Sequence, residues 1–97
     1  MIDIRFEPGK KVSIKGHAGY AERGHDIVCA AISTLYCTMI MSDGIAGTKD
    51  GEEMLAICME PSCEKTFNLF CAGMQEVARQ YPTFCTFRRG KMDLADY

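Results

Sequence analysis

The sequence contains no C-x-x-C pair, and neither of its two histidines has a second histidine four residues further on. Zinc knuckles and ribbons hold their metal on such pairs, and dithiol redox sites use C-x-x-C, so neither kind of site is indicated. The glycines also lack the Walker pattern that cradles nucleotide phosphates. We therefore expect no metal and no cofactor.

Long hydrophobic runs and an excess of basic charge are also missing. No apolar segment approaches the roughly 20 residues that a membrane-spanning helix needs. The formal net charge is −2, which gives no reason to expect nucleic acid or an anionic membrane as a direct partner. The first residues alternate as in a strand and do not resemble a charged-then-apolar signal segment, so we expect a cytoplasmic protein.

Cysteine, in contrast, is abundant, with six in 97 residues. An even number in a short chain can form a disulfide framework. Four of them lie inside expected helices or strands, where free cysteine packs as a small apolar residue: Cys37, Cys58, Cys71 and Cys85. We therefore expect reduced thiols in a single domain over residues 1–97. Because so short a chain buries only roughly 60–65% of its unfolded surface, we also expect a homodimer.

Apolar periodicity predicts an α+β fold, with two helices packed on one sheet of at least four strands as a two-layer sandwich. The predicted order is ββαβαβ. Residues 2–7 and 11–15 alternate between apolar and polar side chains around a Pro-Gly turn, which predicts a hairpin. The apolar run 54–59 is typical of a central strand buried on both faces, and residues 83–88 predict the last strand.

The two helices are predicted from apolar residues at helical spacing. The first should run from Ile27 to about Ser42 and stop at Gly44, and the second should cover residues 63–80 with Ser62 as its N-cap. Residues 44–53 contain three glycines, and we expect them to form a loop.

The stretch 16–33, with the sequence GHAGYAERGHDIVCAAIS, holds the candidate chemistry. If Asp26 is the N-cap of the first helix, Cys29 is its third residue. Unpaired N–H groups and the positive end of the helix dipole then favour the thiolate, which is the nucleophilic form. The same N–H groups could hold an oxyanion. His17, at the end of a strand, can lie beside this helix start and act as the base.

Alternatives remain open for each residue of this stretch. His25 is a rival base, although a capping or surface role suits it better. Asp26 could also orient the His17 ring, and Ser33, one turn from Cys29, could line the site or simply pack. Cys29 itself could be a buried core thiol. The glycines suit either a mobile loop over substrate or an ordinary connection; they are Gly16, Gly19 and Gly24.

The motif G-H-A, followed after a gap by D-I-V-C-A-A-I-S, resembles the ribosomal-processing cysteine protease family, Prp. The matching segments are Gly16–Ala18 and Asp26–Ser33, and His17 and Cys29 are 12 residues apart, as in the family. The length and the order of the predicted elements also agree, so the resemblance covers essentially the whole chain. Outside the motif, the chain matches the family only in pattern.

The resemblance implies a cytosolic cysteine endopeptidase that works as a homodimer. Such enzymes remove the N-terminal extension of one large-subunit ribosomal protein, number twenty-seven, and cut after an aromatic residue. It also implies that Cys29 is the nucleophile, that His17 is the general base, and that the loop from Gly16 to Gly24 is a mobile cover over the peptide. The alternatives are a non-enzymatic dimeric module that binds a ribosomal protein or the ribosome, and a redox sensor built on Cys29.

Overall fold

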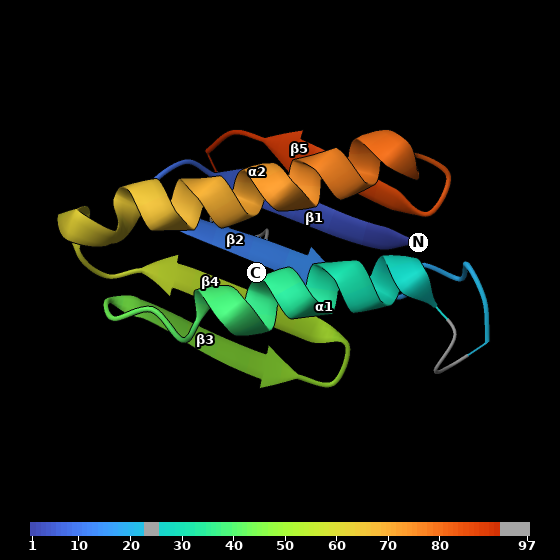
Figure 1. Ribbon diagram of the computed structural model, residues 1–97, viewed down its shortest axis with the longest axis horizontal. Coiled ribbons are helices and arrows are strands. Elements are labelled where there is room, and N and C mark those ends of the chain that lie inside the picture. The colour runs from blue at the N-terminus through green and yellow to red at the C-terminus, as the bar shows by residue number, and fades with distance from the viewer. Residues whose placement is uncertain (23–25, 92–97) are drawn as a thin grey trace.

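The computed structural model describes residues 1–22 and 26–91 and shows five strands and two helices in two layers (Figure 1). The elements, in chain order, are β1 (Ile2–Glu7), β2 (Lys11–Lys15), α1 (Ile27–Met39), β3 (Ile45–Asp50), β4 (Glu53–Cys58), a 3₁₀ turn (Pro61–Cys63), α2 (Glu64–Gln80) and β5 (Cys85–Arg89). The predicted α+β sandwich is confirmed, but the order is ββαββαβ, with one strand more than predicted.

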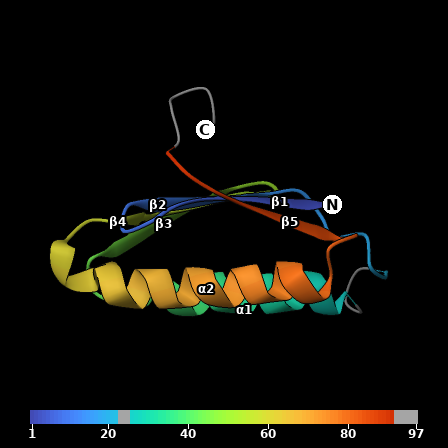
Figure 2. The ribbon, with the colours of Figure 1, turned by 90° about the horizontal axis from the view of Figure 1, so that it is seen from above.

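The sheet has the strand order β3-β4-β2-β1-β5. All neighbours are antiparallel except β1 and β5, which run parallel. The two helices lie side by side on one face of this sheet, and no helix in the described part of the chain covers the other face (Figure 2). The hairpin predicted for residues 2–7 and 11–15 is confirmed as β1 and β2.

The core lies between the helices and the sheet. In β1 the residues Ile2, Ile4 and Phe6 are buried, as the alternation predicts. Each helix contributes one face of buried side chains. These are Val28, Ile32, Tyr36 and Met39 from α1, and Phe67, Cys71, Met74 and Ala78 from α2. Full burial of a Val, Ile, Phe or Met side chain contributes about 1.5–3 kcal/mol, so these faces hold the helices on the sheet.

The prediction of a loop over residues 44–53 is wrong, because β3 occupies most of it. Strand β3 is an edge strand, and only Ile45 in it is buried. It therefore lacks the alternation that identifies a half-buried strand. Gly47 allows it to lie close under α1, since a Cβ there would come within 2.6 Å of Ile40 Cγ2 and 2.7 Å of Tyr36 Oη. The Tyr36 hydroxyl also donates a hydrogen bond to the Thr48 carbonyl (2.9 Å).

The central strand predicted to be buried on both faces is also different. Strand β4 lies inside the sheet, between β3 and β2, but only Ala56 in it is buried. Met54 and Cys58 pack against the core with partial exposure, and the helices cover one face of the sheet. Leu55 and Ile57, on either side of Ala56, are half-buried. The apolar run of β4 therefore indicates a strand that is paired on both edges, and not one that is covered on both faces.

The helix ends differ from the predictions by a few residues. Helix α1 ends at Met39, with Ile40 as its C-cap, before Gly44 is reached. Gly44 instead makes a turn at φ +85°, where a Cβ would collide with the Cys63 sulfur. Ser62 does not cap α2, because it lies inside the 3₁₀ turn and its hydroxyl donates to Glu60. The N-cap position belongs to Cys63, which makes no capping hydrogen bond with its side chain.

All six cysteines are free thiols. Cys63, Cys71 and Cys85 are buried, and burial raises the pKa of the Cys71 thiol to about 12 and that of Cys85 to about 11. Cys37 was expected to pack as a small apolar residue, and this prediction is wrong, because its thiol is exposed. Cys37 lies beside the buried stripe of α1 and is not part of it. No helix in residues 1–22 and 26–91 has the length and apolar character needed to span a bilayer.

Candidate active site

One cleft brings together most of the residues singled out in the sequence. The end of β2, the start of α1 and the turn between β3 and β4 lie at one end of the molecule (Figure 1), and residues of all three line the cleft. Its volume is about 770 Å³, and its lining includes six of the predicted residues, namely Gly16, His17, Gly19, Asp26, Cys29 and Ser33. Gly24 and the rival base His25 lie outside the described residues.

Asp26 is the N-cap of α1, as predicted. Its Oδ1 accepts a hydrogen bond from the Cys29 N–H (2.9 Å), and its Oδ2 accepts one from the Tyr20 N–H (3.2 Å). One carboxylate therefore ties the glycine-rich loop to the helix start. Desolvation raises the pKa of Asp26, but these hydrogen bonds outweigh it and hold that pKa below its ordinary value. Both oxygens accept hydrogen bonds from backbone amides, and among the described residues no hydrogen bond joins this carboxylate to the His17 ring.

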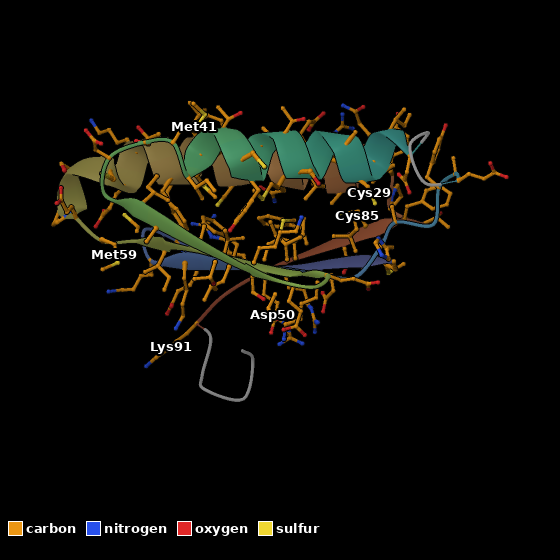
Figure 3. All side chains as sticks on the ribbon, turned by 90° about the horizontal axis from the view of Figure 1, so that it is seen from below. Cys29, Met41, Asp50, Met59, Cys85 and Lys91 are labelled. Carbon is orange, nitrogen blue, oxygen red and sulfur yellow. The ribbon has the colours of Figure 1, made fainter. Side chains whose placement is uncertain are left out.

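The Cys29 sulfur is half-buried and accepts a hydrogen bond from the Ala18 N–H at 3.3 Å. Figure 3 shows Cys29 at the start of α1, where the helix faces the sheet. Burial raises the pKa of the Cys29 thiol, the Ala18 N–H lowers it, and the neighbouring Asp26 carboxylate raises it again. The net pKa lies above the ordinary value for cysteine, so the prediction that the helix start favours the thiolate is wrong for this arrangement.

The oxyanion donors expected at the helix start are engaged as well. The Cys29 N–H donates to the Asp26 side chain, and the Ala30 N–H donates to the Asp26 carbonyl at 3.0 Å. Two of the amides that were expected to hold an oxyanion, those of Cys29 and Ala30, are therefore already paired with Asp26. The backbone donor aimed at the sulfur comes instead from Ala18, in the loop that follows β2.

His17 lies in the cleft with a side chain that is 68% exposed, and its ring bonds a residue that the sequence did not indicate. Its Nε2 lies 2.7 Å from Oε1 of Glu52, in the turn between β3 and β4. Among residues 1–22 and 26–91, no hydrogen bond joins the ring to the Cys29 sulfur. No local pattern pointed to Glu52, because it lies in the segment interpreted as a loop, and the pairing of β2 with β4 brings it near His17.

The remaining loop residues frame the cleft. Gly16 has φ +91°, and a Cβ there would lie 2.5 Å from the Met1 carbonyl oxygen, so only glycine suits this position. Gly19 also has positive φ (+71°), but a Cβ there would meet no atom of the described residues within 4 Å. Tyr20 packs edge-on against Tyr81 and Phe84, with ring centroids 5.8 and 5.2 Å away. These contacts anchor the first part of the glycine-rich loop to the segment that joins α2 and β5.

Solved structures with the same fold are known. The chain resembles the structure titled as an essential ribosomal processing protease Prp from S. aureus with a covalently linked product peptide. The TM-score is 0.82 and the identity 20%, over 93% of this chain and 100% of that one. A second structure of that protein, with a substrate peptide, has a TM-score of 0.75 and 18% identity, over 93% and 100% of the two chains.

A third structure, of SMU.848 from Streptococcus mutans, has a TM-score of 0.65 and 24% identity, over 94% of this chain and 93% of that one. No curated protein matches the sequence. The family model described as cysteine protease Prp, however, matches residues 1–86, which is most of the chain. Together with a cleft that holds a cysteine and a histidine, this match shows that the chain belongs to the cysteine protease Prp family.

Proposed function

We propose that this cysteine protease removes the N-terminal extension from the precursor of large-subunit ribosomal protein number twenty-seven, in the cytoplasm and as a homodimer. The observation that supports it best is the cleft, in which a half-buried cysteine sulfur, a histidine and a backbone N–H aimed at the sulfur converge. A ribosomal substrate follows from the resemblance of the Gly16–Ala18 and Asp26–Ser33 motif to the family. Sedimentation velocity tests the proposed homodimer, which should sediment as a species of twice the mass of the chain.

Cys29 is the nucleophile and His17 the general base in this proposal. Since the pKa of the Cys29 thiol is raised in the free protein, the sulfur needs a base to accept its proton as it attacks the scissile carbonyl. His17 then protonates the leaving amine and afterwards activates the water that hydrolyses the thioester. Attack and loss of the amine leave a thioester on Cys29, and its hydrolysis returns the enzyme to one thiol and one imidazole.

The Ala18 N–H is the donor that we assign to the oxyanion. It already lies 3.3 Å from the sulfur, and the attacked carbonyl carbon must come to bonding distance of that sulfur. The N–H of Cys29 is held by Asp26, so it is not available while the cap is intact. A preorganised amide of this kind stabilises the tetrahedral intermediate without reorganisation at the moment of reaction.

The cleft also has an apolar side, to which we assign the aromatic residue that precedes the cut. Its lining includes Ile2, Ile14, Ile32 and Met54, which lie on β1, β2, α1 and β4. Burial of an aromatic ring against such side chains is favourable because it removes a large apolar area from water. The polar side of the cleft, with His17 and Cys29, then faces the peptide bond.

The proposal is tested by incubating the protein with the organism's own precursor of this ribosomal protein and following intact mass. Wild type should release one N-terminal peptide, with an aromatic residue at its new C-terminus. Cys29→Ala should leave the precursor uncut, since the nucleophile is gone. Cys37→Ala, which removes an exposed thiol of the same helix, should cut like wild type. Cleavage by Cys29→Ala, or no cleavage by wild type, would contradict the proposal.

A further inference from the structure

Glu52 is placed beside His17 by the pairing of two strands. Strands β2 and β4 are antiparallel, and Lys15 is paired with Glu53 at the end of their ladder. The residues that follow in each direction, Gly16 on one strand and Glu52 on the other, therefore face each other just beyond the last pair. The tight turn that carries Glu52 includes Gly51 at φ +61°. The position of the carboxylate thus follows from the sheet and not from a chance approach of two surface loops.

The contact determines which ring nitrogen of His17 holds a hydrogen. Nε2 lies 2.7 Å from the Glu52 carboxylate, and an ionised carboxylate only accepts hydrogen bonds, so Nε2 must be the donor. In the neutral ring, Nδ1 is then the nitrogen with the free lone pair. In the charged ring, the carboxylate lies next to the positive charge and stabilises it.

We infer that Glu52 is a positioning residue for His17, which fixes the tautomer of the ring and holds the ring in the cleft where it receives the proton of Cys29. This inference rests on the proposed function. The base of a cysteine or serine hydrolase works best when a third group orients it, and the cleft supplies such a group here. Glu52 therefore completes a series of nucleophile, base and carboxylate.

The other carboxylates near the cleft do not take this role. Asp26 gives both oxygens to backbone N–H groups. Glu53 is exposed and precedes Met54, which lines the cleft, so strand alternation directs the Glu53 side chain to the opposite face of the sheet. Among the described residues, Glu52 is the carboxylate that lines the cleft and bonds the ring.

Kinetics of three variants test the inference. Glu52→Ala should lower kcat on the order of 10- to 100-fold with little change in KM, because the base is misoriented while the peptide site is intact. Glu52→Asp should recover part of the loss, since it restores a carboxylate one methylene shorter. Glu53→Ala is the matched control, because it removes the same charge from the adjacent residue, and it should behave like wild type. An exposed ion pair adds little stability, so all three should melt near the wild-type temperature.

A second readout does not depend on proteolysis. Nitrogen NMR of the His17 ring, assigned by loss of the signal in His17→Ala, should show the hydrogen on Nε2 in wild type and a mixture of tautomers in Glu52→Ala. Unchanged kcat in Glu52→Ala, or a wild-type ring that in its neutral form carries its hydrogen on Nδ1, would overturn the inference. A raised kcat would overturn it too, because the contact would then restrain the ring. If wild type cuts no precursor, the proposed function fails, while the NMR result still tests the contact.

Discussion

At the scale of single residues, Cys29 shows how opposing influences on one sulfur combine. Burial and the Asp26 carboxylate disfavour the thiolate, whereas the Ala18 N–H favours it, and the net pKa lies above the ordinary value. Asp26 is therefore both the cap that positions the sulfur and a charge that keeps it protonated. The free enzyme holds a thiol, and the proton leaves when a base takes it.

The protonation state predicts how Cys29 reacts with iodoacetamide. Because only the thiolate reacts and the pKa is raised, the alkylation rate of Cys29 in the free protein should be low at neutral pH and should still rise above pH 9. Asp26→Asn keeps a capping side chain but removes the charge, so the rise should move to lower pH. Peptide mapping measures the rate for each cysteine separately. A wild-type rate that has already levelled off near pH 6 would contradict this prediction, since it would indicate a thiolate paired with a charged His17.

The sequence predicted the residues of the site whose placement is local. Asp26 caps the helix that Cys29 begins, and His17 comes from the neighbouring strand end, so caps and spacing were enough to find them. Glu52 was missed because it is 35 residues from His17 along the chain and reaches it only through strand register. The protonation of Cys29 was missed because it depends on burial, which periodicity does not determine.

At the scale of elements, the end of β2 depends on a close approach of two backbones. Gly16 has positive φ, and a Cβ there would meet the Met1 carbonyl oxygen at 2.5 Å. Gly19 has a similar φ, but a Cβ there would meet no described atom within 4 Å. A comparison of substitutions at the two glycines therefore distinguishes the free-energy cost of the backbone conformation, which both share, from the cost of the collision, which only Gly16 has.

We expect Gly16→Ala to destabilise the protein more than Gly19→Ala. A left-handed alanine costs about 1–2 kcal/mol at either site, and the collision at Gly16 adds to that cost because the Met1 backbone has to move. Precursor cleavage should also fall more in Gly16→Ala, since His17 follows directly. Urea unfolding measures the difference in stability. Equal losses in the two variants would show that the approach to Met1 does not matter.

The burial of each element explains whether its sequence pattern was enough to predict it. Strands β1 and β2 alternate clearly between apolar and polar residues in the sequence, and α1 and α2 each bury one stripe, so all four were found. Strand β3 was missed because it is an exposed edge strand with a glycine in it. Its loss from the prediction also removed the turn that carries Glu52, so one missed edge strand hid one residue of the site.

At the scale of the whole molecule, the fold brings three separate segments to one end of the sheet. The end of β2, the start of α1 and the turn between β3 and β4 lie together there (Figure 1) and line the cleft, and the apolar core lies between the two layers. Layer architecture was predictable because the periods of helix and strand differ. The strand order was not, since no local pattern encodes which strands are neighbours.

The central claim is that Cys29 is the sulfur that attacks a peptide carbonyl in this cleft. It is tested most directly with a peptide acyloxymethyl ketone that carries an aromatic residue next to the reactive group, followed by peptide mapping of the labelled protein. We predict a single adduct on Cys29 and none on the more exposed Cys37, because only the cleft binds the peptide beside a base. An adduct on Cys37 instead of Cys29, or equal labelling of both, would contradict the claim.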